Sequence, residues 1–193
     1  AMLTTKEQRL ASGIYALSQV IAERINKWEN KNKDYYPFIP NYSDDLLEAF
    51  EIAKKHVLRK RKPYFLDIGC GIGNIMLTAE AFGFEPYGID YDQAILAMNP
   101  YDETGRHKGK LVYSGWKKED ALQFHGYKQF DIVYMYCPIK DDLLQRKLEL
   151  KVERALKVGT IYICFRKRGS WLERDKRFKR LDQNLPIWKK VLK

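Results

Sequence analysis

Three glycines and two aspartates carry the clearest chemical signal in this chain. Gly69, Gly71 and Gly73 stand at every second position, and Asp67 lies two residues before the first of them. Glycine lets a ligand approach the main chain closely. Asp90 follows 21 positions after Gly69, and a carboxylate can accept charge-assisted hydrogen bonds from both hydroxyls of a ribose, each contributing about 1.5–3 kcal/mol. This spacing predicts the binding of a nucleotide-type cofactor.

Strands and a helix must position these residues. The apolar run at positions 65–68 is typical of a buried parallel strand, and the run at 86–89 predicts a second strand that ends at Asp90. Between them, Ile75, Leu77, Ala79 and Phe82 predict an apolar helix. Ligands of open α/β sheets bind at the carboxyl ends of the strands. The sequence therefore places the glycine turn and Asp90 at one edge of a parallel sheet.

The glycine spacing separates two cofactor classes. A dinucleotide fingerprint needs glycine or alanine at position 74, where this chain has Asn74. The Gly-x-Gly-x-Gly pattern, with Asp67 before it and Asp90 after it, resembles motif I of the class I S-adenosylmethionine (SAM) methyltransferases. A dinucleotide fold or a degenerate nucleotide fold is the alternative.

That resemblance implies an α/β fold with a Rossmann-like, mostly parallel sheet, flanking helices and an amino-terminal helical extension. It implies S-adenosyl-L-methionine as the cofactor and S-adenosyl-L-homocysteine as the product. The cofactor contacts it implies are Asp67, Gly69, Cys70, Gly71, Gly73, Asn74, Asp90, Tyr91, Asp120, Ala121 and Tyr136.

Asp120 and Ala121 resemble the acid-plus-small-residue motif that lies near the adenine in this family. The acid would accept from the adenine amino group, and the following backbone N–H would meet a ring nitrogen. The alternative is that Asp120 only caps a short turn. The third strand is predicted upstream, at positions 111–114.

The fourth predicted strand, positions 130–136, runs into Tyr136-Cys137-Pro138-Ile139. In the family this point faces the sulfonium and the acceptor, so Tyr136 is the candidate catalytic residue. The chain lacks the Asn/Asp/Ser-Pro-Pro motif of enzymes that methylate exocyclic amines of bases. Cys137 precedes its proline, the reverse of the Pro-Cys order of cytosine carbon-5 enzymes, so a packing cysteine is favoured over a nucleophile. No general base is evident.

A second, looser resemblance covers roughly Asp34 to Trp171. The Leu/Lys/Glu-rich helix after the fourth strand, followed by an apolar strand at 160–165, is similar to the small Dot1-like protein-lysine methyltransferases. It implies a protein lysine as an alternative acceptor and a lid over the methionine end of SAM, with Tyr36, Phe38 and Tyr42 as candidates. These rings could instead pack a helix onto the sheet.

We expect one domain over residues 1–193. Residues 2–60 form a helical extension or lid, in which Leu10, Ile14, Leu17, Ile21, Ile25 and Trp28 mark one helix face. Residues 63–165 form the SAM-binding core, and residues 166–193 form a basic carboxyl-terminal segment. After the fifth strand the sequence predicts one helix within 172–181 and one strand within 187–192, one strand short of a seven-stranded sheet.

Charge is distributed unevenly. The net charge is +10, yet residues 1–139 carry 18 basic and 18 acidic residues, whereas residues 140–193 carry 17 basic and 7 acidic residues. The segment from Arg166 to Arg180 interleaves cations with Trp171 and Phe178, a pattern that can follow a phosphate backbone and stack bases. An acidic protein, a membrane surface or a merely solvated helix is the alternative.

Other features limit the function class. Cys70, Cys137 and Cys164 form no C-x-x-C pair and predict buried thiols in a reducing, cytoplasmic location. The scattered histidines predict no metal site, and no apolar run is long enough to span a membrane. We therefore predict a SAM-dependent methyltransferase acting on nucleic acid or protein, with a non-catalytic SAM-binding module as the alternative.

Overall fold

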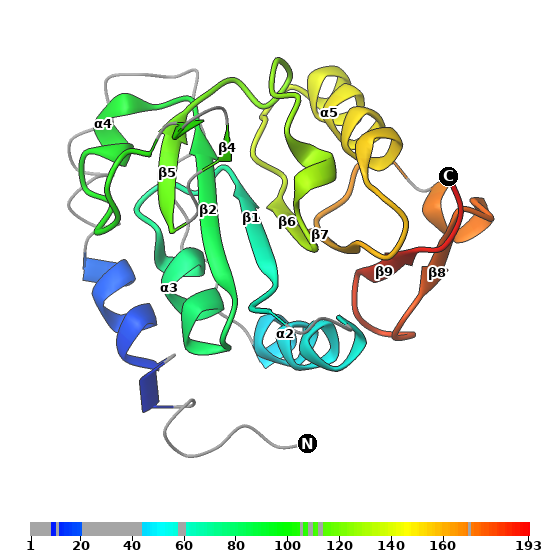
Figure 1. Ribbon diagram of the computed structural model, residues 1–193, viewed down its shortest axis with the longest axis horizontal. Coiled ribbons are helices and arrows are strands. Elements are labelled where there is room, and N and C mark those ends of the chain that lie inside the picture. Colours follow the sequence, from blue (N-terminus) through cyan, green and yellow to red (C-terminus); the bar gives the residue numbers. More distant parts are fainter. Residues whose placement is uncertain are drawn as a thin grey trace.

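The computed structural model describes residues 9–10, 12–20, 44–57, 61–104, 106–107, 110–111, 114–169 and 171–193. A seven-stranded sheet forms the centre, and helices flank it (Figure 1). Its elements are α2 (Asp44–His56), β1 (Tyr64–Ile68), α3 (Asn74–Ala81), β2 (Glu85–Asp90), α4 (Gln93–Leu96), β3 (Arg106–His107), β4 (Lys110–Leu111), β5 (Gly115–Lys118), η1 (Tyr127–Gln129), β6 (Ile132–Tyr136), α5 (Asp142–Ala155), β7 (Ile161–Phe165), η2 (Trp171–Arg174), β8 (Phe178–Arg180) and β9 (Ile187–Lys190).

The strand order is β5-β2-β1-β6-β7-β9-β8. The first five strands in this order are parallel, whereas β9 runs antiparallel to both β7 and β8. The chain builds outward from β1 to β5 and then returns to place β6 beside β1. Because the direction of winding reverses between β1 and β6, the carboxyl edge there is the expected ligand site of such a sheet. The predicted α/β, Rossmann-like fold class is confirmed.

Each face of the sheet carries its own apolar core because successive strand residues point to opposite faces. On one face α2 and α3 pack over Phe65, Tyr134 and Ile163. On the other face α5 packs over Val133 and Tyr162 together with η1 and η2. With both faces covered, the central strands are mostly apolar on both sides, and Asp67 is the charged exception in β1.

The predicted position of the third strand is wrong. The third strand is Gly115–Lys118 and not positions 111–114, since Lys110–Leu111 belongs to a separate two-stranded hairpin. The first residue of this strand must be glycine, because the Thr104 side chain and the Asp102 carbonyl occupy the space that a Cβ on Gly115 would take. A glycine at a strand start has the sequence signature of a break, which hid this strand.

The carboxyl-terminal region also differs from the prediction. A helix within 172–181 is absent from the described chain; residues 171–174 form a short 3-10 turn, and Phe178–Arg180 is a strand paired with β9. Phe178 and Trp188 point into the core under α5, so burial of two aromatic rings favours the hairpin. This hairpin completes the seven-stranded sheet.

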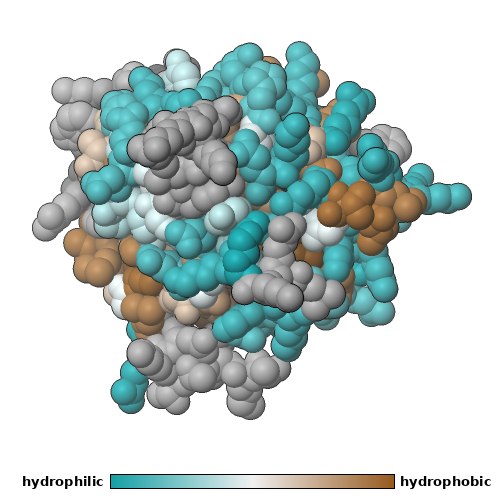
Figure 2. All heavy atoms as spheres, in the orientation of Figure 1, coloured by the Kyte–Doolittle hydropathy of each residue, from teal (hydrophilic) through white to brown (hydrophobic). Residues whose placement is uncertain are grey.

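The amino-terminal extension is described only in part. Residues 12–20 are helical as predicted, but Leu10 and Leu17 on the predicted apolar face are 47% and 67% exposed. Ile14 on the same face is half-buried. The other predicted face residues Ile21, Ile25 and Trp28 and the lid candidates Tyr36, Phe38 and Tyr42 lie outside the described residues. In the described part of the chain, no helix is both long enough and apolar enough to cross a membrane. Hydrophilic residues predominate on the molecular face shown in Figure 2.

Candidate cofactor site

The glycine turn joins β1 to α3 at the carboxyl edge of the sheet. Its three glycines all have left-handed backbone, with φ of 81° at Gly69, 48° at Gly71 and 78° at Gly73. The N–H groups of Gly69 and Cys70 donate to the Ile89 carbonyl at 2.8 and 3.1 Å. The turn is therefore tied to the end of β2, the strand that carries Asp90.

Side chains from elsewhere fill the space that these glycines leave. A Cβ on Gly69 would lie 2.7 Å from Cβ of Pro138, and one on Gly73 would lie 2.6 Å from Oδ1 of Asn99. Asn99 also donates from Nδ2 to the Gly71 carbonyl at 3.0 Å and accepts from the Tyr101 N–H at 3.0 Å. Asn99 thus clamps the glycine turn, a role that sequence reasoning missed because no local pattern marks it.

Asp90 lies at the carboxyl end of β2 and faces the glycine turn. Its Oδ2 accepts from the Gly71 N–H at 2.9 Å, and its Oδ1 accepts from the Asp92 N–H at 2.9 Å. Burial raises the pKa of Asp90, while these N–H donors partly oppose the shift. Each carboxylate oxygen has two lone pairs, so both retain acceptor capacity for a ligand.

Asp67 is buried one strand away, on β1. Its side chain is 1% exposed, and Oδ2 has no hydrogen-bond partner among the described residues. Burial, reinforced by the charge of Asp90, raises the pKa of Asp67 well above its ordinary value. A buried carboxyl oxygen without a partner is costly, which is consistent with a position behind a ligand site.

The Asp120-Ala121 pair forms a turn after β5. Oδ1 of Asp120 accepts from the Leu122 N–H at 2.8 Å, and the Ala121 carbonyl accepts from the Tyr127 hydroxyl at 2.6 Å. Asp120 therefore caps this turn, as one of the two predictions has it, and this contact leaves its Oδ2 free of the turn. The same two residues line a cavity at the carboxyl edge of the sheet, and the turn fixes their position in its wall.

A cavity of about 320 Å³ lies at this carboxyl edge. It brings together five predicted site residues from three strand ends: Gly69, Asp90, Tyr91, Asp120 and Ala121. Its other walls are not among the predicted cofactor contacts, although Pro138 and Ile139 belong to the predicted motif after the fourth strand: Ile68, Ile89, Asp92, Glu119, Leu122, Pro138, Ile139, Lys140 and Leu144. Apolar walls with a few carboxylates suit a flat base joined to a hydroxyl-bearing sugar, so the residues fit the nucleoside part of SAM.

The remaining predicted residues do not line this cavity. Asp67, Cys70, Gly71, Gly73 and Asn74 are buried in or behind the glycine turn. Gly71 and Gly73 shape the turn through their left-handed backbone, and a direct cofactor contact by any of the five residues stays a prediction. The thiol of Cys70 is fully buried, and burial raises its pKa.

Tyr136 and Cys137 lie at the end of β6, beside the cavity and outside its walls. The Tyr136 ring packs against Phe165 with centroids 6.1 Å apart. Cys137 is buried and has left-handed backbone, with φ of 42°. Burial of the thiol favours the packing role that the residue order Cys-Pro predicts.

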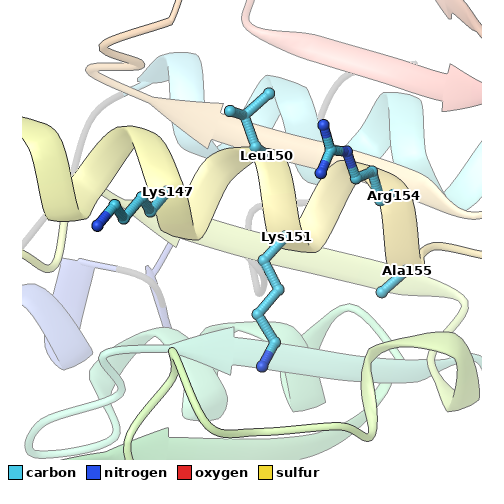
Figure 3. A pocket seen from close by; sticks show the side chains of 5 residues that line it. All are labelled: Lys147, Leu150, Lys151, Arg154 and Ala155. Atoms are coloured by element: carbon cyan, nitrogen blue, oxygen red, sulfur yellow. The ribbon is translucent and has the colours of Figure 1, made fainter.

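A second hollow, of about 460 Å³, lies on the outer side of α5 and is lined by Lys147, Leu150, Lys151, Arg154 and Ala155 (Figure 3). Its cationic side chains point in different directions from the helix and do not converge on one position. Nζ of Lys151 donates to the Leu122 carbonyl at 2.5 Å. This hollow is therefore a less convincing ligand site than the cavity at the strand ends.

No family model and no curated protein matches this chain. Many solved structures match its fold. An RNA methyltransferase from Salinibacter ruber, in complex with S-adenosyl-L-homocysteine, is 17% identical with a TM-score of 0.52; the match covers 80% of this chain and 95% of that one.

Two further matches have a TM-score of 0.49. A SAM-dependent methyltransferase from Clostridium acetobutylicum is 18% identical, over 76% of this chain and 56% of that one. An amino pentose methyltransferase from Micromonospora echinaspora, solved with bound SAM, is 17% identical, over 75% and 55%. This chain spans about half the length of these larger proteins. Its seven-stranded sheet and flanking helices are those of the class I SAM-dependent methyltransferase fold.

Proposed function

We propose that this protein is a SAM-dependent methyltransferase. The observation that carries the proposal is the cavity at the carboxyl edge, which gathers Gly69, Asp90 and the Asp120-Ala121 turn from three separate strand ends. The spacing of these residues predicts a SAM site, and the fold is one that methyltransferases share. A dinucleotide site is disfavoured because Asn74 stands where the dinucleotide fingerprint needs a small residue.

In this proposal the residues of the chain bind and align the cofactor. Asp90 would hold the ribose hydroxyls with its remaining lone pairs, and Asp120 would meet the base edge through the oxygen that the turn leaves unused. The apolar side chains of Ile68, Ile89 and Ile139 would exclude water. SAM, when bound, supplies an activated methyl group on a sulfonium, so alignment with the acceptor is the main task, and orientation can supply about 7–11 kcal/mol of the barrier.

We propose a nucleic acid as the acceptor, on the grounds of charge. Residues 140–193 carry ten more basic than acidic residues, and two of those acids, Glu149 and Glu153, are buried. The segment from Arg166 to Arg180 is only partly available, since Lys167 pairs inward and Arg177 and Arg180 pair with Asp175 and Glu173. Its exposed cations Arg166, Arg174, Lys176 and Lys179 support contact with a phosphate backbone.

A protein lysine is the second candidate acceptor. The end of β6 presents Tyr136 and offers no amide or carboxylate side chain for an exocyclic base amine, an observation that favours a different acceptor atom. A lysine acceptor, with an ordinary pKa of about 10.4, would have to lose a proton before transfer. A cytoplasmic location belongs to the same proposal, supported by three buried free thiols at Cys70, Cys137 and Cys164.

Calorimetric titration with SAM and with its demethylated product is the first test. Micromolar binding of either supports the cofactor assignment, and absence of both rejects it. Incubation with radiolabelled SAM and separate RNA, DNA and protein fractions then tests the acceptor. Nuclease-sensitive label supports nucleic acid, protease-sensitive label supports protein, and cofactor binding without any transfer supports a non-catalytic module.

A further inference from the structure

Two neighbouring strands end in unusual backbone beside the cofactor cavity. Tyr136, the last residue of β6, pairs in register with Phe165, the last residue of β7. The residues that follow them, Cys137 and Arg166, have φ of 42° and 52°. Left-handed backbone is unfavourable for residues other than glycine and persists where the surroundings impose it, often at functional sites. Arg166 is therefore held in place by the fold.

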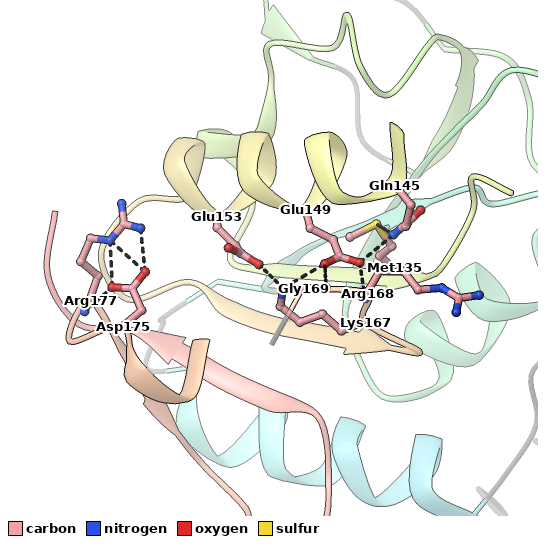
Figure 4. A network of polar contacts seen from close by, with 9 residues as sticks. All are labelled: Met135, Gln145, Glu149, Glu153, Lys167, Arg168, Gly169, Asp175 and Arg177. Atoms are coloured by element: carbon pink, nitrogen blue, oxygen red, sulfur yellow. Dashed lines mark hydrogen bonds and ion pairs between the residues drawn. The ribbon is translucent and has the colours of Figure 1, made fainter. Parts of the chain in front are cut away.

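A buried carboxylate fixes the loop that follows Arg166. Oε1 of Glu149 accepts from the Arg168 N–H at 2.8 Å, and Oε2 accepts from the Gly169 N–H at 2.8 Å and from Nζ of Lys167 at 2.9 Å (Figure 4). Lys167 also pairs with Glu153 at 2.8 Å. Although burial raises the pKa of Glu149, these donors outweigh it, and the pKa is lowered. The Lys167 side chain is therefore engaged in buried ion pairs, whereas the Arg166 side chain is exposed to solvent.

The same network reaches the wall of the cofactor cavity. Nε2 of Gln145 donates to Glu149 at 3.1 Å, and Oε1 of Gln145 accepts from the N–H of Ile139 at 3.1 Å. Ile139 lines the cavity. The buried α5 side chains thus hold the loop after β6 and the loop after β7 at fixed positions relative to each other, so Arg166 is placed with respect to the cofactor site.

Among the described residues, the Arg166 side chain has no acidic partner, unlike its neighbours. Its guanidinium lies 5.4 Å from the centroid of the Tyr136 ring, within the range of a cation–π contact. Arg168, Arg177 and Arg180 each pair with a carboxylate. No carboxylate of the described residues pairs with Arg166, which is exposed. A planar guanidinium held in this way matches the oxygens of a phosphate.

We propose that Arg166, presented by the loop 166–169 and resting on Tyr136, binds a phosphate group of the acceptor. The assignment to an acceptor rests on the proposed methyltransferase function; phosphate binding by Arg166 can be measured without it. The phosphate could belong to a polynucleotide backbone or to a small phosphorylated molecule. The same chemistry serves both, and the experiment distinguishes them.

The test measures binding of a short fluorescent single-stranded RNA to the full chain. We expect Arg166→Ala to weaken binding about tenfold or more, because a charge-assisted contact is lost, and Arg166→Lys to restore only part of the affinity, because lysine lacks the planar fork. Two variants that each remove one other positive charge serve as controls: Lys179→Ala on β8, and Lys128→Ala on η1, which precedes the amino end of β6. Each should weaken RNA binding less than Arg166→Ala does. Equal losses from Arg166→Ala and Lys179→Ala would indicate a diffuse patch and overturn the proposal.

The variant Arg166→Gly separates phosphate binding from a purely structural role of Arg166, because it should keep thermal stability while losing RNA affinity. Glycine accepts left-handed backbone without strain, so this variant should melt above Arg166→Ala and no lower than wild type, yet bind RNA as weakly as Arg166→Ala. Full RNA affinity in Arg166→Gly would overturn the proposal.

Competition identifies the source of the phosphate. If adenosine monophosphate displaces the RNA from the wild-type protein and binds more weakly to Arg166→Ala, the acceptor is a small phosphorylated molecule. If the RNA stays bound, the phosphate belongs to a polynucleotide. Binding of an acidic peptide but not of RNA or the nucleotide would overturn the proposal. SAM titration is run in parallel: a wild type that fails to bind SAM rejects the methyltransferase function, while the RNA result still decides the role of Arg166.

Discussion

At Gly73 the chain combines left-handed backbone with a close neighbour, the Asn99 amide. Gly83 offers a natural comparison. It has a similar φ of 85°, but nothing lies within 4 Å of the position of its missing Cβ. Comparing Gly73 with Gly83 therefore separates two reasons why a position requires glycine: left-handed backbone, and lack of space for a Cβ atom.

We expect Gly73→Ala to be more destabilising than Gly83→Ala. Gly83→Ala should cost about 1–2 kcal/mol, the penalty of a left-handed alanine, whereas Gly73→Ala adds displacement of Asn99 and should also weaken SAM binding. Urea unfolding and calorimetric titration of both variants test this. Equal unfolding free energies for the two variants would contradict a clamping role for Asn99.

Asp90 is the single carboxylate on which the cofactor assignment depends most. Asp90→Ala should lower SAM affinity about 10- to 100-fold, the effect of losing charge-assisted hydrogen bonds from ribose hydroxyls. Calorimetry measures the change, with Glu48→Ala on α2 as a matched loss of one exposed carboxylate. Unchanged affinity in Asp90→Ala would remove Asp90 from the ribose site.

At the scale of the elements, Asp131 joins the amino ends of three strands. It accepts from the Tyr64 N–H of β1 at 2.9 Å and pairs with Arg61 at 3.0 Å and with Lys157, which precedes β7, at 2.9 Å. Its side chain is 2% exposed. Burial raises the pKa of Asp131, but Lys157, the Tyr64 N–H and Arg61 outweigh it, so the pKa is lowered.

A carboxyl group with a lowered pKa stabilises the fold above its unfolded pKa of about 3.9, and this contribution disappears as the pH falls through the folded pKa. Asp131→Asn should therefore lower the free energy of unfolding by about 1–3 kcal/mol at neutral pH. The difference from wild type should shrink below about pH 4. Urea unfolding across this range tests it, with exposed Asp102→Asn as control; a difference that is constant with pH would contradict the electrostatic origin.

Across the whole molecule, charge is divided along one edge of the sheet. The cofactor cavity collects Asp90, Asp92, Glu119 and Asp120 on the side of β2 and β5, while Arg166 and Arg168 follow β7. Such an arrangement favours a cationic ligand at one end of the edge and a polyanion at the other. The proposed cofactor and acceptor would therefore meet near β6.

The two covered faces also predict how the molecule opens. β1, β6 and β7 lie between both apolar cores, whereas β8 is a three-residue edge strand with two exposed residues. Amide hydrogen exchange should be slowest in β1 and β6 and markedly faster in β8, because local opening of an edge exposes little apolar surface. Peptide-resolved mass spectrometry measures this, and protection of β8 equal to that of β1 would contradict it.

Features that depend on neighbours along the chain can be predicted from local sequence patterns. The strand at 65–68, the glycine turn, the following helix and Asp90 are specified by hydrophobic periodicity and by glycine geometry, which act over a few residues. The Asp120-Ala121 turn is equally local. These signals, together with the resemblance to motif I that they carry, predicted the fold class and the glycine turn with Asp90. The resemblance, and not periodicity, supplied Asp120 and Ala121.

Features that need partners far away in the sequence become visible in the folded chain alone. Asn99 clamps Gly73, Pro138 and Ile139 wall the cavity, Glu149 captures the loop after β7, and Phe178 and Trp188 turn a basic segment into a hairpin. Each depends on packing between segments that are far apart in sequence, and hydrogen-bond and ion-pair partners are set by that packing rather than by local pattern. The same packing between distant segments determines which cations of the segment 166–180 are buried, which form ion pairs and which remain exposed to a ligand.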